Sequence, residues 1–175
     1  KAIAAVKDAR EVAPDDVALI LTEANLQIKL GNKDEFANLM SQAIELDPAN
    51  PTLYFNLGVI AGEQGESDKS KEYYRKAIEL DPEYADAYIN LGSALLEDDK
   101  VLVEEMNKSL NDFDKYDEIK AKQVELYKEV IPVYEKAYNL RPDDIDTIRT
   151  LMSLYENTEM EDKFNSMKEK YDSMK

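Results

Sequence analysis

Apolar residues recur at steps of three and four along nearly the whole chain, which places them on one face of an α-helix. Leu39, Ala43 and Leu46 follow this spacing, and Tyr74, Ala77 and their neighbours repeat it further on. Only 5 glycines and 6 prolines occur, too few to punctuate the many short strands of an all-β protein. The pattern therefore predicts an all-α fold.

The helical stretches repeat with a fixed period that four prolines mark. Pro14, Pro48 and Pro82 are spaced 34 residues apart, and Pro142 follows after 60 residues, which is one period plus 26. A period of this size is typical of a helical repeat array, in which each unit packs against its neighbours. One unit of this array is therefore enlarged.

Each period has the pattern of two helices joined by a turn. Gly31 and Gly65 divide their periods, and glycine at such a break suits the left-handed residue that ends a helix. Asp47 and Asp81 precede prolines, and a residue before proline is disfavoured in the helical conformation. Each period is thus predicted to form a helix–turn–helix unit.

The spacing and the residue types together resemble the tetratricopeptide repeat family. The resemblance implies an α-α superhelix, or solenoid, in which small residues let paired helices approach closely. The matching positions are Tyr54, Leu57, Gly58, Tyr74, Ala77 and Pro82 in one period, and Tyr88, Leu91 and Gly92 in the next.

We therefore expect a single repeat domain over residues 1–175. A partial repeat, with its second helix only, covers 1–16, and regular repeats cover 17–50 and 51–84. An enlarged repeat with about 26 extra residues covers 85–144, and a C-terminal repeat covers 145–175.

The extra residues are predicted to form an elongated antiparallel helical hairpin. Asn111 and Asp112 are the most turn-like residues in it, and Pro132 lies within the returning helix, as a kink or where a lost hydrogen bond is tolerated. We expect the acidic run from Glu97 to Asp99 to break the outgoing helix, with Asp99 as a cap. Two interpretations stay open: a structural elaboration packed on the next repeat, or an exposed arm for docking or dimerisation.

Charge and composition argue against several classes of function. The net charge of −16 repels nucleic-acid phosphates and anionic lipid, so we expect neither nucleic-acid binding nor binding to a membrane surface. No apolar run approaches the roughly 20 residues that span a bilayer, so we expect no membrane insertion of this fragment. Histidine and cysteine are absent from the sequence, and no phosphate-binding glycine motif occurs. The segment 111–117 has acids spaced as in a calcium loop but lacks the glycine at its sixth position. We predict no enzyme, no cofactor and no metal site.

The resemblance also implies a binding surface, because the first helix of each unit lines a concave groove in this family. Asn25 and Asn56 match the carboxylate clamp of chaperone-binding members, but Leu21, Asp86 and Asn90 stand where its cations belong, so that clamp is not expected. The groove would instead offer apolar side chains and amides to a protein or peptide. The candidate groove residues are Leu21, Asn25, Ile28, Phe55, Asn56, Val59, Ile89, Asn90, Ser93 and Arg149.

The function expected from this pattern is a protein–protein interaction scaffold that binds a peptide or partner protein in the groove. The alternative is a structural module that homodimerises through the long hairpin or a terminal helix. Lys1 opens directly into a helical pattern without an initiator methionine, so we expect a longer natural protein. An exported, periplasmic bacterial protein is one hypothesis for its location, and a cytoplasmic protein is the alternative.

Overall fold

The computed structural model describes residues 1–174, and within this range it contains nine helices and no strand. The prediction of an all-α fold is confirmed. The helices are α1 (Ala2–Val12), α2 (Val17–Lys29), α3 (Lys33–Leu46), α4 (Pro51–Glu63), α5 (Ser67–Leu80), α6 (Ala85–Lys108), α7 (Phe113–Leu140), α8 (Ile145–Asn157) and α9 (Glu161–Ser173).

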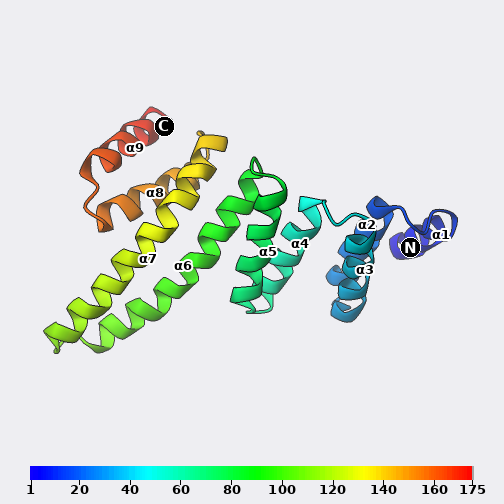
Figure 1. Ribbon diagram of the computed structural model, residues 1–175, viewed down its shortest axis with the longest axis horizontal. Helices are drawn as coiled ribbons and strands as arrows, with labels where there is room; N and C mark the ends of the chain where they lie inside the picture. The colour runs from blue at the N-terminus through cyan, green and yellow to red at the C-terminus, as the bar shows by residue number, and fades with distance from the viewer. Residues whose placement is uncertain (175) are drawn as a thin grey trace.

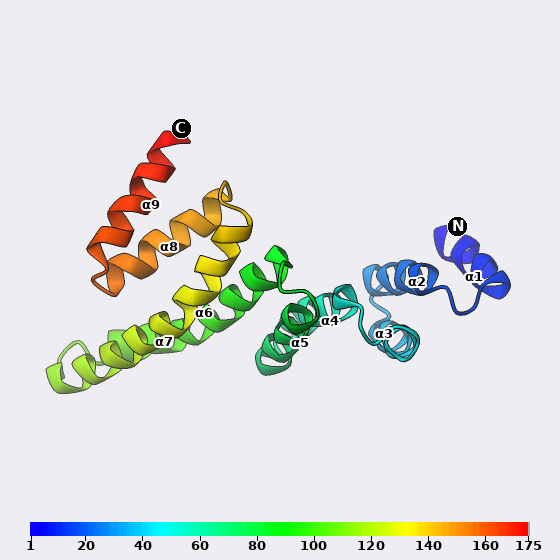
Figure 2. The ribbon, with the colours of Figure 1, turned by 45° about the horizontal axis from the view of Figure 1, so that its top comes forward.

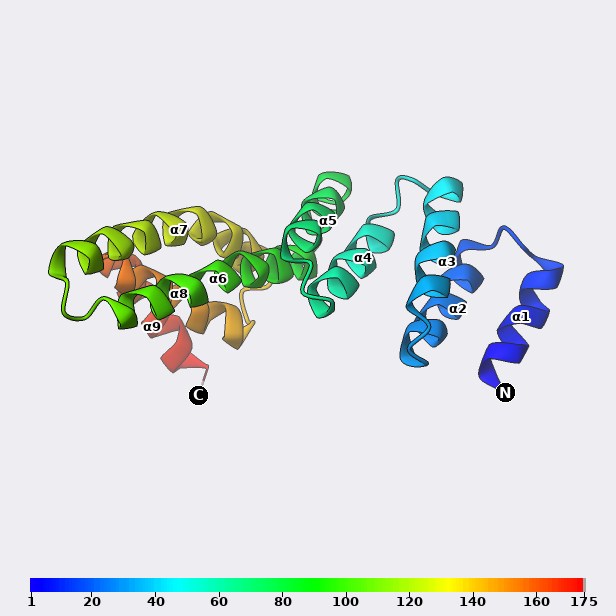
Figure 3. The ribbon, with the colours of Figure 1, turned by 90° about the horizontal axis from the view of Figure 1, so that it is seen from below.

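The helices follow one another along the long axis of the molecule as antiparallel pairs (Figure 1). Helix α1 lies at one end, and α8 and α9 form a V at the other end (Figure 2). Between them, α6 and α7 form a long antiparallel hairpin that extends beyond its neighbours (Figure 3). This arrangement is the predicted solenoid with one elongated hairpin.

Short polar residues and glycines set the helix ends. The side chain of Asp16 accepts hydrogen bonds from two backbone amides at the start of α2, and Asn50 and Asp144 cap α4 and α8 in the same way. Gly31 and Gly65 have φ angles of 80° and 75°, the left-handed region that glycine adopts without strain. These residues explain why the chain turns where the sequence pattern changes.

Two glycines let aromatic rings touch the backbone of a neighbouring helix. A Cβ atom added at Gly58 in α4 would lie 2.6 Å from Cε1 of Tyr74 in α5. At Gly92 in α6, it would lie 2.5 Å from Cε2 of Tyr134 in α7. Both distances are far shorter than a carbon–carbon contact allows, so these positions fix the spacing of the two helix pairs.

The core is divided into two clusters. Helix α4 contributes to both, because Leu53 belongs to one and Phe55 and Val59 pack against the other. The N-terminal cluster consists of Ile20, Ala24, Phe36, Leu39, Met40, Ala43 and Leu53. The C-terminal cluster consists of Tyr74, Leu91, Leu95, Tyr127, Val130, Ile131, Tyr134, Leu151, Leu154 and Tyr155.

The predicted break in the outgoing helix of the hairpin is wrong. Helix α6 runs without interruption through Asp99, which bonds across the hairpin instead of capping its own helix. Its carboxylate accepts hydrogen bonds from Nε2 of Gln123 at 2.7 Å and from the hydroxyl of Tyr127 at 3.0 Å. Burial and the neighbouring carboxylate raise the pKa of Tyr127, so its hydroxyl stays a donor to Asp99.

The hairpin turns where the sequence predicts. Asp112 caps α7 through a hydrogen bond from the backbone N–H of Lys115 at 3.2 Å. Helix α7 continues through Pro132, whose exposed side chain places the missing N–H on the solvent side. At the tip, Leu110 and Phe113 are 60% and 79% exposed, so part of the apolar stripe lies uncovered.

A buried ion pair attaches α1 to the rest of the array. Glu23 in α2 is only 2% exposed, and its carboxylate pairs with the guanidinium of Arg10 and, at 3.7 Å, with the ammonium group of Lys7. Arg10 also donates to Oε1 of Gln42 in α3 at 2.7 Å. The guanidinium of Arg10 therefore connects α1 to two helices, α2 and α3, through polar contacts.

The close approach at Gly92 yields the first prediction. Gly92→Ala places a methyl group inside the ring of Tyr134, and overpacking of this kind costs about 1–3 kcal/mol of unfolding free energy. Chemical denaturation measures the loss. In Gly62→Ala the new methyl group meets only the side chain of Ser70, with Oγ at 3.3 Å and Cβ at 4.0 Å, so the loss of unfolding free energy should be smaller. Equal stability of Gly92→Ala and the wild type would contradict this account.

The buried ion pair yields the second prediction. Glu23→Ala leaves the guanidinium of Arg10 without its carboxylate, and breaking a buried pair in this way costs about 3 kcal/mol. Amide hydrogen exchange should accelerate most in α1. The double change Arg10→Met with Glu23→Leu removes both charges and should recover most of the protection. Slow exchange in α1 of Glu23→Ala would show that apolar contacts alone hold this helix.

Candidate functional site

A hollow of about 400 Å³ lies between α4, α5 and α6, beside the predicted groove residues. Its volume is at the lower end of the range of about 300–1,000 Å³ that is typical of small-molecule sites. Its lining residues are Val59 and Gly62 from α4, Gly65 from the turn, Ser67, Ser70 and Tyr74 from α5, and Asn90, Ser93, Ala94 and Glu97 from α6.

Small side chains make the hollow, and hydrogen bonds hold its lining in place. The hydroxyl of Ser70 donates to the backbone carbonyl of Gly58 at 2.8 Å, which joins α5 to α4. The hydroxyl groups of Ser93 and Tyr134 lie 3.1 Å apart, which joins α6 to α7. The lining is therefore positioned by bonds that do not depend on a ligand.

Several polar side chains on α2, α4, α5 and α6 make no hydrogen bond within residues 1–174. Oγ of Ser67 lines the hollow, is buried and has no hydrogen bond. Over the same range, no hydrogen bond involves the side-chain amides of Asn25, Asn56 or Asn90, which come from α2, α4 and α6. None of these three amides is fully buried, so they are open to hydration, and the N–H and C=O groups of a ligand can replace that water.

The electrostatic environment of the hollow is acidic. Burial raises the pKa of Tyr74, and the negative charge of Glu63 acts in the same direction, while a hydrogen bond with Ser70 opposes it. Glu97 is the one charged residue in the described lining, and its carboxylate pairs with the exposed ammonium group of Lys100. Tyr74 thus stays neutral, and the carboxylates of Glu97 and Glu63 make the surroundings of the hollow acidic.

Lys71, a buried cation on α5, already pairs with two carboxylates. Lys71 is 6% exposed, and its ammonium group lies 2.8 Å from Oδ2 of Asp98 and 3.9 Å from Oδ1 of Asp68. Lys71 does not line the hollow. Its charge is balanced within the protein, so it does not convert the hollow into an anion site.

Phe55 on α4 is part of an aromatic group with Tyr74 on α5 and Tyr84, the residue that precedes α6. Its ring centroid lies 5.8 Å from that of Tyr74 and 5.0 Å from that of Tyr84. The side chain is half-buried and packs against the C-terminal cluster. Phe55 therefore supports the wall of the candidate groove as well as contributing to its surface.

The structure brings some of the predicted groove residues together and separates others. Val59, Asn90 and Ser93 line the one hollow. Leu21 and Ile28 on α2 pack against the N-terminal cluster and are half-buried. Among the remaining predicted residues, Ile89 is half-buried on α6, Asn56 is half-buried on α4, and Asn25 is exposed on α2.

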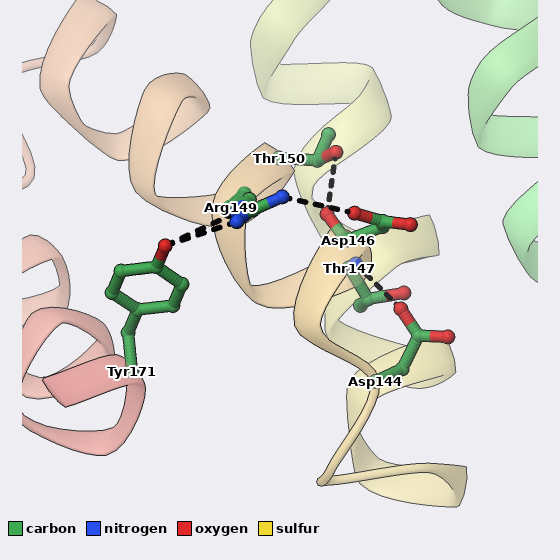
Figure 4. Close-up of polar contacts among 6 residues, drawn as sticks. All are labelled: Asp144, Asp146, Thr147, Arg149, Thr150 and Tyr171. Atoms are coloured by element: carbon green, nitrogen blue, oxygen red, sulfur yellow. Dashed lines mark hydrogen bonds and ion pairs between the residues drawn. The ribbon is translucent and has the colours of Figure 1, made fainter. Parts of the chain in front are cut away.

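Arg149 on α8 makes contacts of its own at the far end of the array (Figure 4). Its Nε and Nη2 donate to the hydroxyl of Tyr171 in α9, at 3.3 and 3.1 Å, and its guanidinium lies 5.4 Å from the ring centroid. It also pairs with Asp146 at 3.4 Å. These contacts hold α9 against α8, and Arg149 is not among the residues that line the hollow.

Asp86 is neutralised by a residue that is distant in sequence. Both carboxylate oxygens of Asp86 accept from the guanidinium of Arg141, with Nη2 and Oδ2 2.8 Å apart. This bidentate pair joins the start of α6 to the end of α7. A clamp that binds a peptide carboxylate would need a cation at this position. The position holds the carboxylate of Asp86, already paired with Arg141, so this position does not supply that cation.

Sequence reasoning missed the part of the hollow that belongs to α5. The family comparison considers first helices, whereas Ser67, Ser70 and Tyr74 come from the second helix of the pair. The clustering of Gly62, Gly65 and small hydroxyl residues within a few positions is a signal that could have indicated a cavity.

Other kinds of site find no support in the described part of the chain. Over residues 1–174, acidic side chains form no group of three or more that could hold a metal ion. Along the same residues, each helix is either too short or too polar to cross a lipid bilayer.

Comparison with solved structures finds the same solenoid in several proteins. The crystal structure of MamA matches with a TM-score of 0.65 and 21% identity, covering 98% of this chain and 85% of that one. The first repeat domain of Spaghetti (RPAP3), bound to the HSP90 peptide SRMEEVD, has a TM-score of 0.58 and 18% identity, covering 80% and 93%. The Arabidopsis OM64 TPR domain has a TM-score of 0.55 and 18% identity, covering 80% and 94%.

A search of curated protein sequences found no match. Two models of the tetratricopeptide repeat match the chain, one over residues 19–50 and 51–84 and another over 73–115. Together with the helix pairs, their close approach at glycine and the likeness in fold, these matches show that the chain belongs to the tetratricopeptide repeat family.

Proposed function

We propose that this chain binds a peptide segment of a partner protein along the side formed by α2, α4 and α6. Tetratricopeptide solenoids are protein-interaction scaffolds, and they generally have no catalytic activity. The RPAP3 domain with the same fold is solved with a bound peptide, which supports peptide binding as the mode of interaction here. We infer no enzymatic activity.

The observation that carries the proposal is the set of three unpartnered amides. Asn25, Asn56 and Asn90 come from three successive first helices of the pairs. Each amide offers a donor and an acceptor, which is what the N–H and C=O groups of an extended peptide require. Val59 and Phe55 supply apolar surface beside these amides for the side chains of the peptide.

A photo-crosslinking experiment tests this placement. A photoreactive amino acid at Asn56 or Asn90 should crosslink to the same partner protein, identified by mass spectrometry from the cell that makes the chain. The matched control carries the photoreactive residue at Arg75, an exposed position on α5. Crosslinking of that partner from Arg75 alone would place binding on another face.

The third prediction concerns affinity. The double change Asn56→Ala with Asn90→Ala removes about two hydrogen bonds to the peptide, which at about 1 kcal/mol each weakens binding about 30-fold. Fluorescence anisotropy with the partner segment measures this, and the melting temperature should stay close to that of the wild type. A change of less than threefold would argue against the amides as the recognition groups.

A second candidate function is self-association through the hairpin. Val101, Leu110 and Phe113 on the hairpin are 59%, 60% and 79% exposed. These apolar side chains are not covered by the hairpin itself, so a second copy could cover them. The net charge of −16 opposes contact between two copies, so association should strengthen with salt as this repulsion is screened.

The fourth prediction tests this candidate. If the hairpin is the contact, sedimentation at high salt should show a dimer for the wild type and a monomer for Phe113→Asp. The substitution is at an exposed site, so the fold should be retained. The matched control is Val12→Asp, at an 87% exposed apolar residue in α1. A monomer at every concentration and salt would eliminate self-association.

A further inference from the structure

We propose that the hollow between α4, α5 and α6 accepts an arginine side chain of the bound partner. This inference rests on the proposed function and names the chemistry of one contact within it. Three properties of the hollow support it: its size, its charge and its unsatisfied acceptors.

The size suits one long side chain. Glycine, serine and alanine occupy six of the ten lining positions of the hollow of about 400 Å³, so small side chains bound much of it. Tyr74 is only 5% exposed and its ring packs on Gly58, so it forms a wall, and the apolar stem of an arginine can lie beside Val59 and Ala94. A long, unbranched side chain therefore fits this lining better than a branched aliphatic one.

The charge selects a cation. Glu97 lines the hollow, and the negative charge of Glu63 acts on the hydroxyl of Tyr74, another lining residue. Lys100 pairs with Glu97, but this pair is exposed on both sides, and such pairs stabilise a protein by only about 0–1 kcal/mol. An incoming guanidinium can therefore displace Lys100 at small cost. The net charge of −16 acts in the same direction by attracting basic segments.

The acceptors match a donor with several N–H groups. Within the described residues, the amide of Asn90 and the buried Oγ of Ser67 have no partner. A guanidinium has five N–H donors in a fixed plane and can donate to groups in several directions at once. An ammonium group is compact and would reach fewer of them. The lining therefore favours arginine over lysine.

Nuclear magnetic resonance with a small probe tests this contact directly. N-acetyl-L-arginine amide, titrated into the ¹⁵N-labelled full chain, should shift the side-chain amide of Asn90 and the backbone amides of residues 62–70 and 93–97 in a saturable way. N-acetyl-L-citrulline amide has nearly the same shape without the charge and should bind at least tenfold more weakly. N-acetyl-L-glutamate amide should not saturate these signals.

Matched charge variants complete the fifth prediction. Glu63→Gln with Glu97→Gln should weaken binding of the arginine probe tenfold or more. The control Glu45→Gln with Glu161→Gln changes the net charge equally at exposed positions on α3 and α9, and should weaken it less than twofold. Equal binding of arginine and citrulline probes, or equal loss in both variants, would overturn the proposal.

The two proposals can fail separately. Partner crosslinking from Asn56 and Asn90 with no arginine binding would retain the scaffold and reject the arginine site. Saturable arginine binding without crosslinking at these positions would retain the arginine site and reject the groove as the binding surface.

Discussion

The close approach of an aromatic ring to a helix backbone is the constraint on which this solenoid depends. Tyr74 packs on Gly58 and Tyr134 packs on Gly92, at distances that leave no room for a β-carbon. The two contacts set how α5 lies against α4 and how α7 lies against α6. They also position the hollow, because Tyr74 lines it and Tyr134 holds Ser93 by a hydroxyl contact. The fold and the candidate site thus share the same side chains.

Much of the fold could be predicted from the sequence because its determinants are local. Gly31 and Gly65 end helices through backbone conformation, and the hairpin turn near Asp112 follows from a local cap. The break expected at Asp99 was wrong because its partners, Gln123 and Tyr127, are far along the chain. From local sequence alone, an acidic residue in the middle of a helix is predicted to end that helix. The prediction changes only when its hydrogen-bond partner on another helix is known.

The candidate site was predictable only in part, for a related reason. Asn90, Val59 and Ser93 could be selected from the family pattern, since a helical face follows from spacing alone. The contribution of Ser67 and Tyr74 depends on how three helices meet, which spacing does not give. Arg149 was selected as a groove residue, but its side chain is held by Tyr171, a contact between helices that no local pattern reveals. Side chains that serve inter-helix contacts are therefore the ones that sequence reasoning places least well.

The division of the core has a consequence for how this molecule opens. Helix α4 is the element common to both clusters, and α3 contacts α4 much less extensively than α5 contacts α6. In a linear array, stability is a sum of terms between neighbours, so a weak junction divides the chain into separately cooperative segments. By this argument we expect α1 to α3 to open at a lower free energy than α5 to α9. In the proposed binding mode, Asn25 would leave the groove in that partly open state while Asn90 stayed in place, so the length of surface offered to a peptide would depend on a local unfolding equilibrium.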